Sequence, residues 1–371
     1  MVRGLAAILV LAGHLRAYLF QSYGELSDPG LLSQGFYFAT GFGHQAVVVF
    51  FVLSGFLVGG RAFDDLLRAR FSWPRYLLRR LTRLWIVVVP ALLMTLVFDT
   101  IGRELTNGAG YDGRHYQVFS SGPREVVGID LSLATLLGNV AFLQTITVPT
   151  FGSNGPLWSL ANEFWYYIIF PLMGWLLLAG VGVVFKLAGG AVLIALFAWL
   201  PAALWLGGAL WVAGAAAGWL THRGLLPARM SSSNAVRLGA LGLIVTLLAL
   251  SKAWPNRVGD LELGLSIGLA LPVIATSPEF GRGYGMLARG ISEFSYTLYL
   301  THFPLLTLIV LAAQAPVRMP PGMLAAGLYV GLFGAAIAWA AAFWWLFERN
   351  TDRVFTWLAR GLPMQHAARG I

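Results

Sequence analysis

The chain is a series of long apolar runs separated by short polar or basic segments. Ten runs come close to the roughly 20 residues that a helix needs to cross the hydrocarbon core of a bilayer. The pattern therefore predicts an all-α integral membrane protein, a bundle of about ten transmembrane helices. Glycine and alanine are frequent, as in the stretch GALWVAGAAAGW, and predict close packing of neighbouring helices. The runs lie at approximately residues 4–20, 44–60, 84–101, 155–178, 184–200, 203–220, 236–253, 261–277, 291–313 and 324–347.

The distribution of basic residues sets the expected orientation. Most of the 25 Lys and Arg residues flank the runs on the side that holds the N-terminus. The positive-inside rule assigns that side to the cytoplasm, so we expect both termini there. Residues 1–348 then form the membrane domain, and residues 349–371 form a basic cytoplasmic tail that anchors on the membrane surface. The first run lacks a small-residue cleavage site, so we expect it to be retained rather than removed as a signal peptide.

The longest segment on the opposite side, residues 102–153, contains Asp112, His115 and Glu125. It is long for a structureless loop, so one hypothesis is that it covers the bundle or faces the substrate. The alternative is a packed surface loop without substrate contact. Within it, the apolar spacing of LSLATLLGNVAFLQ predicts a helix that lies along the interface or dips into the bundle.

Composition agrees with a membrane protein and excludes several kinds of chemistry. The 371 residues are 58% hydrophobic and 11% charged, whereas soluble domains are about 25% charged. The absence of cysteine excludes disulfides, thiolate catalysis and cysteine metal sites, and we expect no metal centre. The pI of about 10.1 would suggest nucleic acid for a soluble protein. Because the basic residues cluster between apolar runs, we expect anionic lipid headgroups and no nucleic acid.

The first run has a polar residue near each end, Arg3 and His14, eleven positions apart. Eleven helical steps amount to about three turns plus 20°, so both side chains lie on one face. His14 is then roughly 16 Å deeper in the bilayer than Arg3. An ionisable group at that depth faces a protein interior or a wet cavity. The alternative for His14 is a structural histidine held by hydrogen bonds.

A second group of basic residues precedes the third run, in RYLLRRLTRLW. Arg75, Arg79 and Arg83 share one helix face, and Arg80 lies beside them. Guanidinium groups bind phosphates through paired hydrogen bonds, which indicates a phosphorylated donor from the cytosol. The alternative is that these arginines extend to the membrane surface for their own solvation.

The fourth run contains a carboxylate, Glu163, which is a functional-site candidate inside a membrane. Ser159 lies one turn before it and Tyr167 one turn after it, and its partner is expected among buried cations or hydroxyls. The alternative is that Glu163 joins two helices by hydrogen bonds. In the second run, Ser54 could be a nucleophile, but no GxSxG motif surrounds it, and helix packing or a channel lining is the favoured interpretation.

The ninth run, in ISEFSYTLYLTHFP, places Ser295, Tyr299 and His302 at i, i+4 and i+7, on one stripe. We expect Pro304 to open the helix just beyond His302 and to free backbone carbonyls. The polar residues of the runs together predict a polar seam through the bundle. Its members are His14, Glu163, Ser295, Tyr299 and His302, and arginines line its inner mouth.

Five stretches in this order resemble the membrane-bound acyltransferase family 3, from Arg3 to about Glu348. They are RGLAAILVLAGH, FFVLSGFLV, RRLTRLW, PLWSLANEFWYY and SYTLYLTHFP. The resemblance implies a multi-pass enzyme of about ten core helices in the plasma (bacterial inner) membrane. Such enzymes move acetyl or other short acyl groups, typically from acyl-coenzyme A, onto hydroxyls of sugars, glycolipids, polysaccharides or macrolides. Family members usually have several residues before the arginine, whereas here only Met1 and Val2 precede Arg3.

The resemblance also assigns roles. The family's Arg-to-His pair corresponds to Arg3 and His14, its basic residues before the third helix to Arg79, Arg80 and Arg83, and its fourth-helix carboxylate to Glu163. We expect neutral His14 to act as general base, Glu163 to orient it, and the arginines to hold the phosphates of acetyl-CoA or another acyl-CoA. Substrate contacts are expected from Ser54, Trp158, Ser159, Ser295, Tyr299 and His302.

Other interpretations of the same residues remain. A covalent acyl-histidine relay uses the same groups as direct transfer. A proton-coupled transporter or flippase would use the intramembrane His and Glu to carry protons and the arginines to bind an anionic or sugar-containing substrate. Transporters often contain inverted repeats, and the two halves of this chain show no such similarity, which counts against this second class. A structural subunit without chemistry would leave the polar motifs unexplained.

Overall fold

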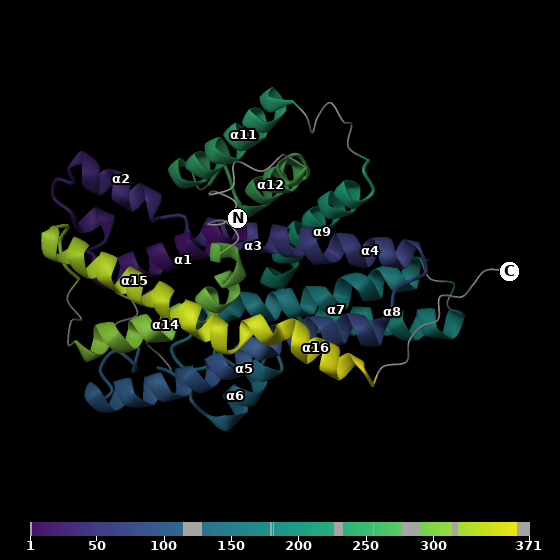
Figure 1. Ribbon diagram of the computed structural model, residues 1–371, viewed down its shortest axis with the longest axis horizontal. Helices are drawn as coiled ribbons and strands as arrows, with labels where there is room; N and C mark the ends of the chain where they lie inside the picture. Colours follow the sequence, from purple (N-terminus) through teal and green to yellow (C-terminus); the bar gives the residue numbers. More distant parts are fainter. Residues whose placement is uncertain are drawn as a thin grey trace.

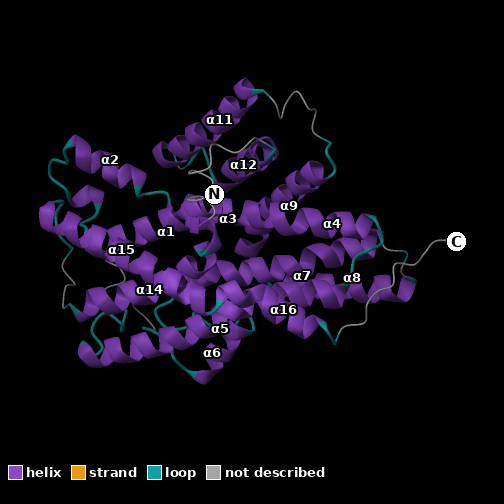
Figure 2. Ribbon diagram, in the orientation of Figure 1, coloured by secondary structure: helices purple, strands orange, loops and turns teal. Residues whose placement is uncertain are grey.

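The computed structural model describes residues 2–113, 128–178, 180, 182–225, 233–254, 256–276, 290–313 and 318–361. This part of the chain consists of helices joined by loops and contains no strand (Figure 2). Seven of its helical segments are long and apolar enough to cross a membrane. The chain is therefore a multi-pass membrane protein. The count of about ten spans and the cytoplasmic location of the termini stay predictions.

Each predicted apolar run overlaps a helix. The helices are α1 (Val2–Leu19), α2 (Leu31–Ala39), α3 (Gly43–Ser54), α4 (Gly60–Leu67), α5 (Trp73–Leu105), α6 (Leu133–Val140), α7 (Trp158–Leu178), α8 (Val183–Trp199), α9 (Ala202–His222), α11 (Asn234–Ala253), α12 (Asp260–Ala275), α14 (Ser295–Ala312), α15 (Met323–Leu346) and α16 (Thr351–Ala359). Helix α6 confirms the helix expected within the 102–153 segment. Helix α2 was not expected, and His115 and Glu125 lie outside the described residues.

Helix α14 is the most enclosed helix of the bundle. It contacts α1, α5 and α15 (Figure 1), and 78% of its residues are buried. By contrast, only 6% of α11, which lies with α12 at one edge of the bundle, is buried. Because α14 is surrounded by protein, its polar side chains face other helices and not lipid.

Pro304 does not open α14, contrary to the expectation from the sequence. The helix continues to Ala312, although proline has no N–H to donate to the carbonyl of Leu300. Asn154 replaces that donor: its Nδ2 lies 2.9 Å from the Leu300 oxygen. A side chain from a distant segment therefore satisfies the carbonyl, and the helix has no reason to unwind.

Asn154 belongs to a segment, residues 141–157, that enters the bundle after α6 and is irregular apart from a short 3₁₀ helix, η3 (Gly155–Leu157). Phe142, Phe151 and Asn154 in this segment are at most 1% exposed. Irregular backbone at membrane depth is tolerated only where protein or water satisfies its polar groups, and here the Asn139 side chain bonds the Pro149 carbonyl and the Phe151 N–H. The end of the long outer segment thus packs inside the bundle.

Glycines bring α9 into backbone contact with the second membrane segment, where α3 passes through a π-helical turn, η2 (Gly55–Gly59), into α4. A Cβ on Gly55 would lie 1.8 Å from the Trp211 carbonyl oxygen, and one on Gly214 would lie 2.0 Å from the Val52 oxygen. The close packing expected from GALWVAGAAAGW is therefore confirmed.

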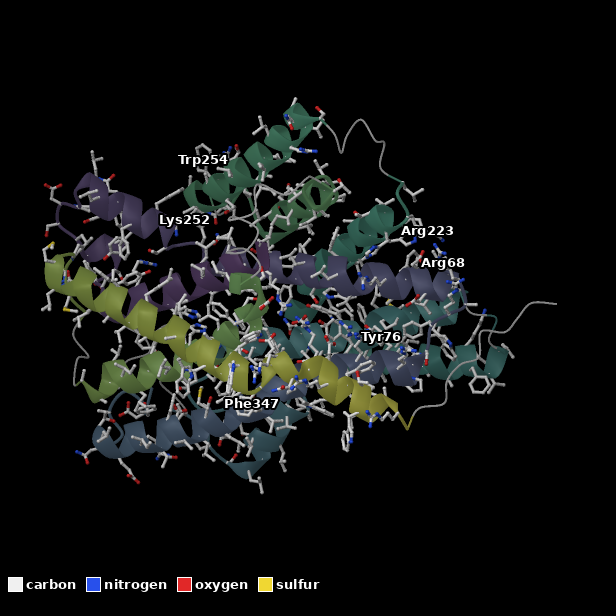
Figure 3. The ribbon with its side chains drawn as sticks, in the orientation of Figure 1. Arg68, Tyr76, Arg223, Lys252, Trp254 and Phe347 are labelled. Atoms are coloured by element: carbon white, nitrogen blue, oxygen red, sulfur yellow. The ribbon has the colours of Figure 1, made fainter. Side chains whose placement is uncertain are left out.

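The far end of the same helix pair is fixed by charge. Asp64 of α4 forms ion pairs with the Nε of Arg68, one turn later, and with the Nε of Arg223, at the end of α9, both at 2.7 Å. Figure 3 shows Arg68 and Arg223 side by side at this end of the molecule. The ion pair with Arg223 joins the end of α4 to the end of α9.

We predict that Gly55→Ala destabilises the protein by about 1–3 kcal/mol, because the added methyl forces α3 and α9 apart. Thermal unfolding of the detergent-purified chain measures the effect. Gly327→Ala on α15 is the matched control, because a Cβ there meets no atom within 4 Å. Equal melting temperatures for the two variants would contradict the backbone contact.

Candidate active site

The structure brings two members of the predicted seam into direct contact. His14 Nδ1 of α1 lies 2.9 Å from His302 Nε2 of α14. The two rings stack with centroids 5.2 Å apart and planes 10° apart, and Phe303 meets His14 edge-on at 5.0 Å. His302 is 1% exposed, whereas His14 is half-buried.

The other nitrogens of the two rings differ. His302 Nδ1 lies 2.8 Å from the carbonyl oxygen of Leu298, one turn earlier on α14. Within the described residues, His14 Nε2 has no hydrogen-bond partner. Both nitrogens of His302 are therefore occupied, and His14 keeps one ring nitrogen available to a substrate.

Glu163 does not orient His14, contrary to the expectation from the sequence. Its Oε1 accepts a 2.7 Å hydrogen bond from Ser54 Oγ and another from the Tyr167 hydroxyl. Trp211 Nε1 of α9 donates to Ser54 Oγ at 3.1 Å. The partners of Glu163 are thus hydroxyls, one of the two kinds of partner expected from the sequence. Ser54 links three helices, which agrees with the packing role expected for it.

Tyr299 and Ser159 form a second pair near the histidines. Their hydroxyl oxygens are 2.8 Å apart, and the Tyr299 hydroxyl also donates to the Pro156 carbonyl at 3.0 Å. The Tyr299 ring lies 6.2 Å from that of His302. Tyr299 therefore holds the start of α7 and the end of the inserted segment against α14.

Two further candidates lie apart from these contacts. Ser295 donates to the Ser292 carbonyl at 2.8 Å, a local bond at the start of its own helix. The half-buried Trp158 packs edge-on against Phe51 with ring centroids 6.1 Å apart. A direct role for either residue in substrate contact stays a prediction.

Three arginines approach one another at the predicted inner end of the bundle, namely Arg3 of α1 and Arg80 and Arg83 of α5. Among the described residues, none of them forms an ion pair within 4 Å. Arg3 lies over the Tyr296 ring at 5.9 Å, and Arg80 over the Tyr167 ring at 5.9 Å.

The three arginines differ in the charged and polar groups that surround them. Arg3 interacts electrostatically with Arg83 and, with the opposite sign, with Glu163 and Glu348. The Nε of Arg80 is enclosed without a hydrogen-bond partner, close to the Tyr76 ring that Figure 3 labels. A buried guanidinium donor without an acceptor is costly, and three arginines lie together here, so this cluster is suited to a bound polyanion.

Arg79 is placed differently from the other arginines. It lies 3.7 Å from an Asp352 oxygen and over the ring of Phe355, at 4.8 Å from its centroid. Both partners belong to α16, in the predicted tail, and α16 packs along α5. A phosphate contact of Arg79 stays a prediction.

Sequence reasoning missed two residues of the site. Glu348 accepts from Thr297 Oγ1 at 2.6 Å and from the Thr297 N–H at 3.2 Å, in the first turn of α14. Its signal was a carboxylate directly after the last apolar run. Asn154, the donor to Leu300, lies in an SNGP stretch that has the composition of a surface turn.

Comparison with known proteins gives one match. Residues 1–348 match the acyltransferase-3 family model, which is described as an acyltransferase domain. Neither the curated proteins nor the solved structures give a match. The matched region contains both histidines, the arginine cluster and the inserted segment.

We predict that Asn154→Ala destabilises the protein by about 1–3 kcal/mol, because it leaves the buried Leu300 carbonyl without a donor. Pro304→Ala restores an N–H four residues after Leu300. Asn154→Ala should therefore lower the free energy of unfolding by a smaller amount in the Pro304→Ala background than in the wild type. A double-mutant cycle of unfolding free energies in detergent measures this difference. The same cost in both backgrounds would contradict the assignment of this hydrogen bond.

Proposed function

The chain belongs to the acyltransferase-3 family, and from this we propose an O-acyltransferase of the bacterial inner membrane. It moves an acetyl or other short acyl group from acyl-coenzyme A to a hydroxyl of a carbohydrate, glycolipid or similar cell-envelope acceptor. The observation that carries the proposal is the enclosed His14–His302 pair. His14 is on the same helix as Arg3, one of three arginines that form no ion pair with the described residues.

His14 is the general base. Its Nε2 takes the proton of the acceptor hydroxyl while the hydroxyl oxygen attacks the thioester carbonyl. The carbon–sulfur bond then breaks and the proton passes to the coenzyme A thiolate. A positioned base of this kind contributes about 10²–10⁴-fold to the rate, and an enclosed site limits competing hydrolysis by water.

Arg3, Arg80 and Arg83 bind the phosphates of coenzyme A. Along α1, Arg3 and His14 are separated by roughly 16 Å, a distance that the extended pantetheine arm bridges. The phosphates then stay at the inner end while the thioester reaches the imidazole. Phosphate oxygens supply the acceptor that Arg80 Nε lacks among the described residues.

The thioester oxyanion needs a donor as well. The hydroxyls of Ser295 and Tyr299 donate to the carbonyls of Ser292 and Pro156, so either one must exchange that acceptor for the oxyanion. We favour Tyr299, whose ring lies 6.2 Å from that of His302. An acyl-histidine relay would use the same His14 nitrogen as nucleophile and gives the same dependence on His14.

We predict that His14→Ala lowers the consumption of acetyl-CoA by the purified protein by about 10²–10⁴-fold, because the general base is lost. Release of free thiol measures the reaction. His44→Ala is the matched control, since His44 is exposed and pairs with Asp260. A transporter would show flux of its substrate without loss of thioester, and that result would contradict the enzyme assignment.

We predict that Arg83→Ala weakens the binding of coenzyme A by about 10- to 100-fold, because each charge-assisted hydrogen bond contributes roughly 1.5–3 kcal/mol. Titration calorimetry in detergent measures the affinity. Arg353→Ala on α16 is the control for net charge, since Arg353 is exposed. Unchanged affinity in Arg83→Ala with the fold intact would remove the phosphate site.

A further inference from the structure

The geometry points to His302 as a positioning residue that holds His14 in one tautomer, with a proton on Nδ1 and none on Nε2. This inference rests on the proposed function and concerns the same site. It replaces the expectation that His302 contacts the substrate, because both of its ring nitrogens already have partners.

The proton positions follow from the Leu298 carbonyl. A carbonyl oxygen only accepts, so the His302 Nδ1 that lies 2.8 Å from it carries a proton. A neutral imidazole has one N–H, so His302 Nε2 is then unprotonated. That nitrogen accepts from His14 Nδ1 across 2.9 Å. His14 is left with an unprotonated Nε2, the atom that the base needs.

The competing arrangement places a second proton on His302. That would put a positive charge on a side chain that is 1% exposed, at a large cost unless an anion compensates it. Among the described residues no carboxylate bonds either ring, and Glu163 is held by Ser54 and Tyr167. The neutral pair is therefore the resting arrangement.

His302 is itself held rigidly. Leu298, its acceptor, is on the preceding turn of the same helix, and Phe303 and Tyr299 pack against the ring. Leu300 lies two residues before His302 on α14, and its carbonyl accepts a hydrogen bond from the Asn154 side chain. This hydrogen bond keeps the helix regular at Pro304. When His14 gains a proton in the reaction, its Nδ1–H bond to His302 becomes charge-assisted and stronger.

The first test compares two substitutions of similar size in the full-length purified protein. In His302→Gln the side chain offers an oxygen to His14 Nδ1–H and an amide donor to Leu298, whereas His302→Leu offers neither. We expect His302→Leu to lower kcat for acetyl-CoA at least about tenfold with KM unchanged, and His302→Gln to retain most of kcat. Equal kcat values for His302→Leu and the wild type would overturn the inference.

The second test fixes the tautomer chemically. Nδ1-methylhistidine at position 14 keeps Nε2 unprotonated, and the His302→Ala background gives the methyl group room. We expect this protein to be more active than His302→Ala with ordinary His14, by about the factor lost in His302→Leu. No gain in activity would contradict a role through the tautomer.

A third test needs no change to His302. In ¹⁵N-histidine-labelled wild-type protein, the resonances lost in His14→Ala identify this ring among the six histidines. They should show a protonated Nδ1 and an unprotonated Nε2, and the reverse pattern would overturn the inference. Full activity of His14→Ala would instead contradict the proposed function. Loss of activity in His14→Ala together with wild-type activity in His302→Leu would remove only the role of His302.

Discussion

The hydrogen bond between His14 and His302 is the interaction on which the rest of this structure depends. It joins the first membrane helix to the most enclosed one across 288 positions of sequence. Helix α14 can occupy that central place only because its polar groups have partners there. The Leu300 carbonyl is bonded by Asn154, and the first turn of α14 is bonded by Glu348.

Inside a membrane, the polar groups that have no partner within the protein indicate where a substrate binds. In lipid, a polar group without a partner costs several kcal/mol, so most side chains of the seam are explained by their bonds to one another. Ser54, Tyr167 and Glu163 satisfy one another, as do Ser159 and Tyr299. Among the candidate site residues that the structure describes, Arg80 Nε and Nε2 of His14 have no hydrogen-bond partner. Both groups lie where the proposed substrate binds.

Packing supports this arrangement from outside the site. The glycines of α9 let its backbone touch the π-helical turn after Ser54, and this close approach brings the Trp211 indole to the Ser54 hydroxyl. A π-helical turn is a frequent feature of functional sites because it shifts the register of the residues that follow. Here it separates Ser54 from the α4 segment that Asp64 fixes to α9.

The sequence by itself determined the apolar helices, the common face of Arg3 and His14, and the polar stripe that includes Tyr299 and His302. Each of these follows from the helical period and the cost of charge in lipid, which act within one helix. Only the tertiary structure decided that His302 and not Glu163 is the partner of His14, that Pro304 stays inside a regular helix, and that Arg79 lies against α16. The physical reason is that the rotation and depth of a helix are set by the side chains packed against it, which come from distant parts of the chain.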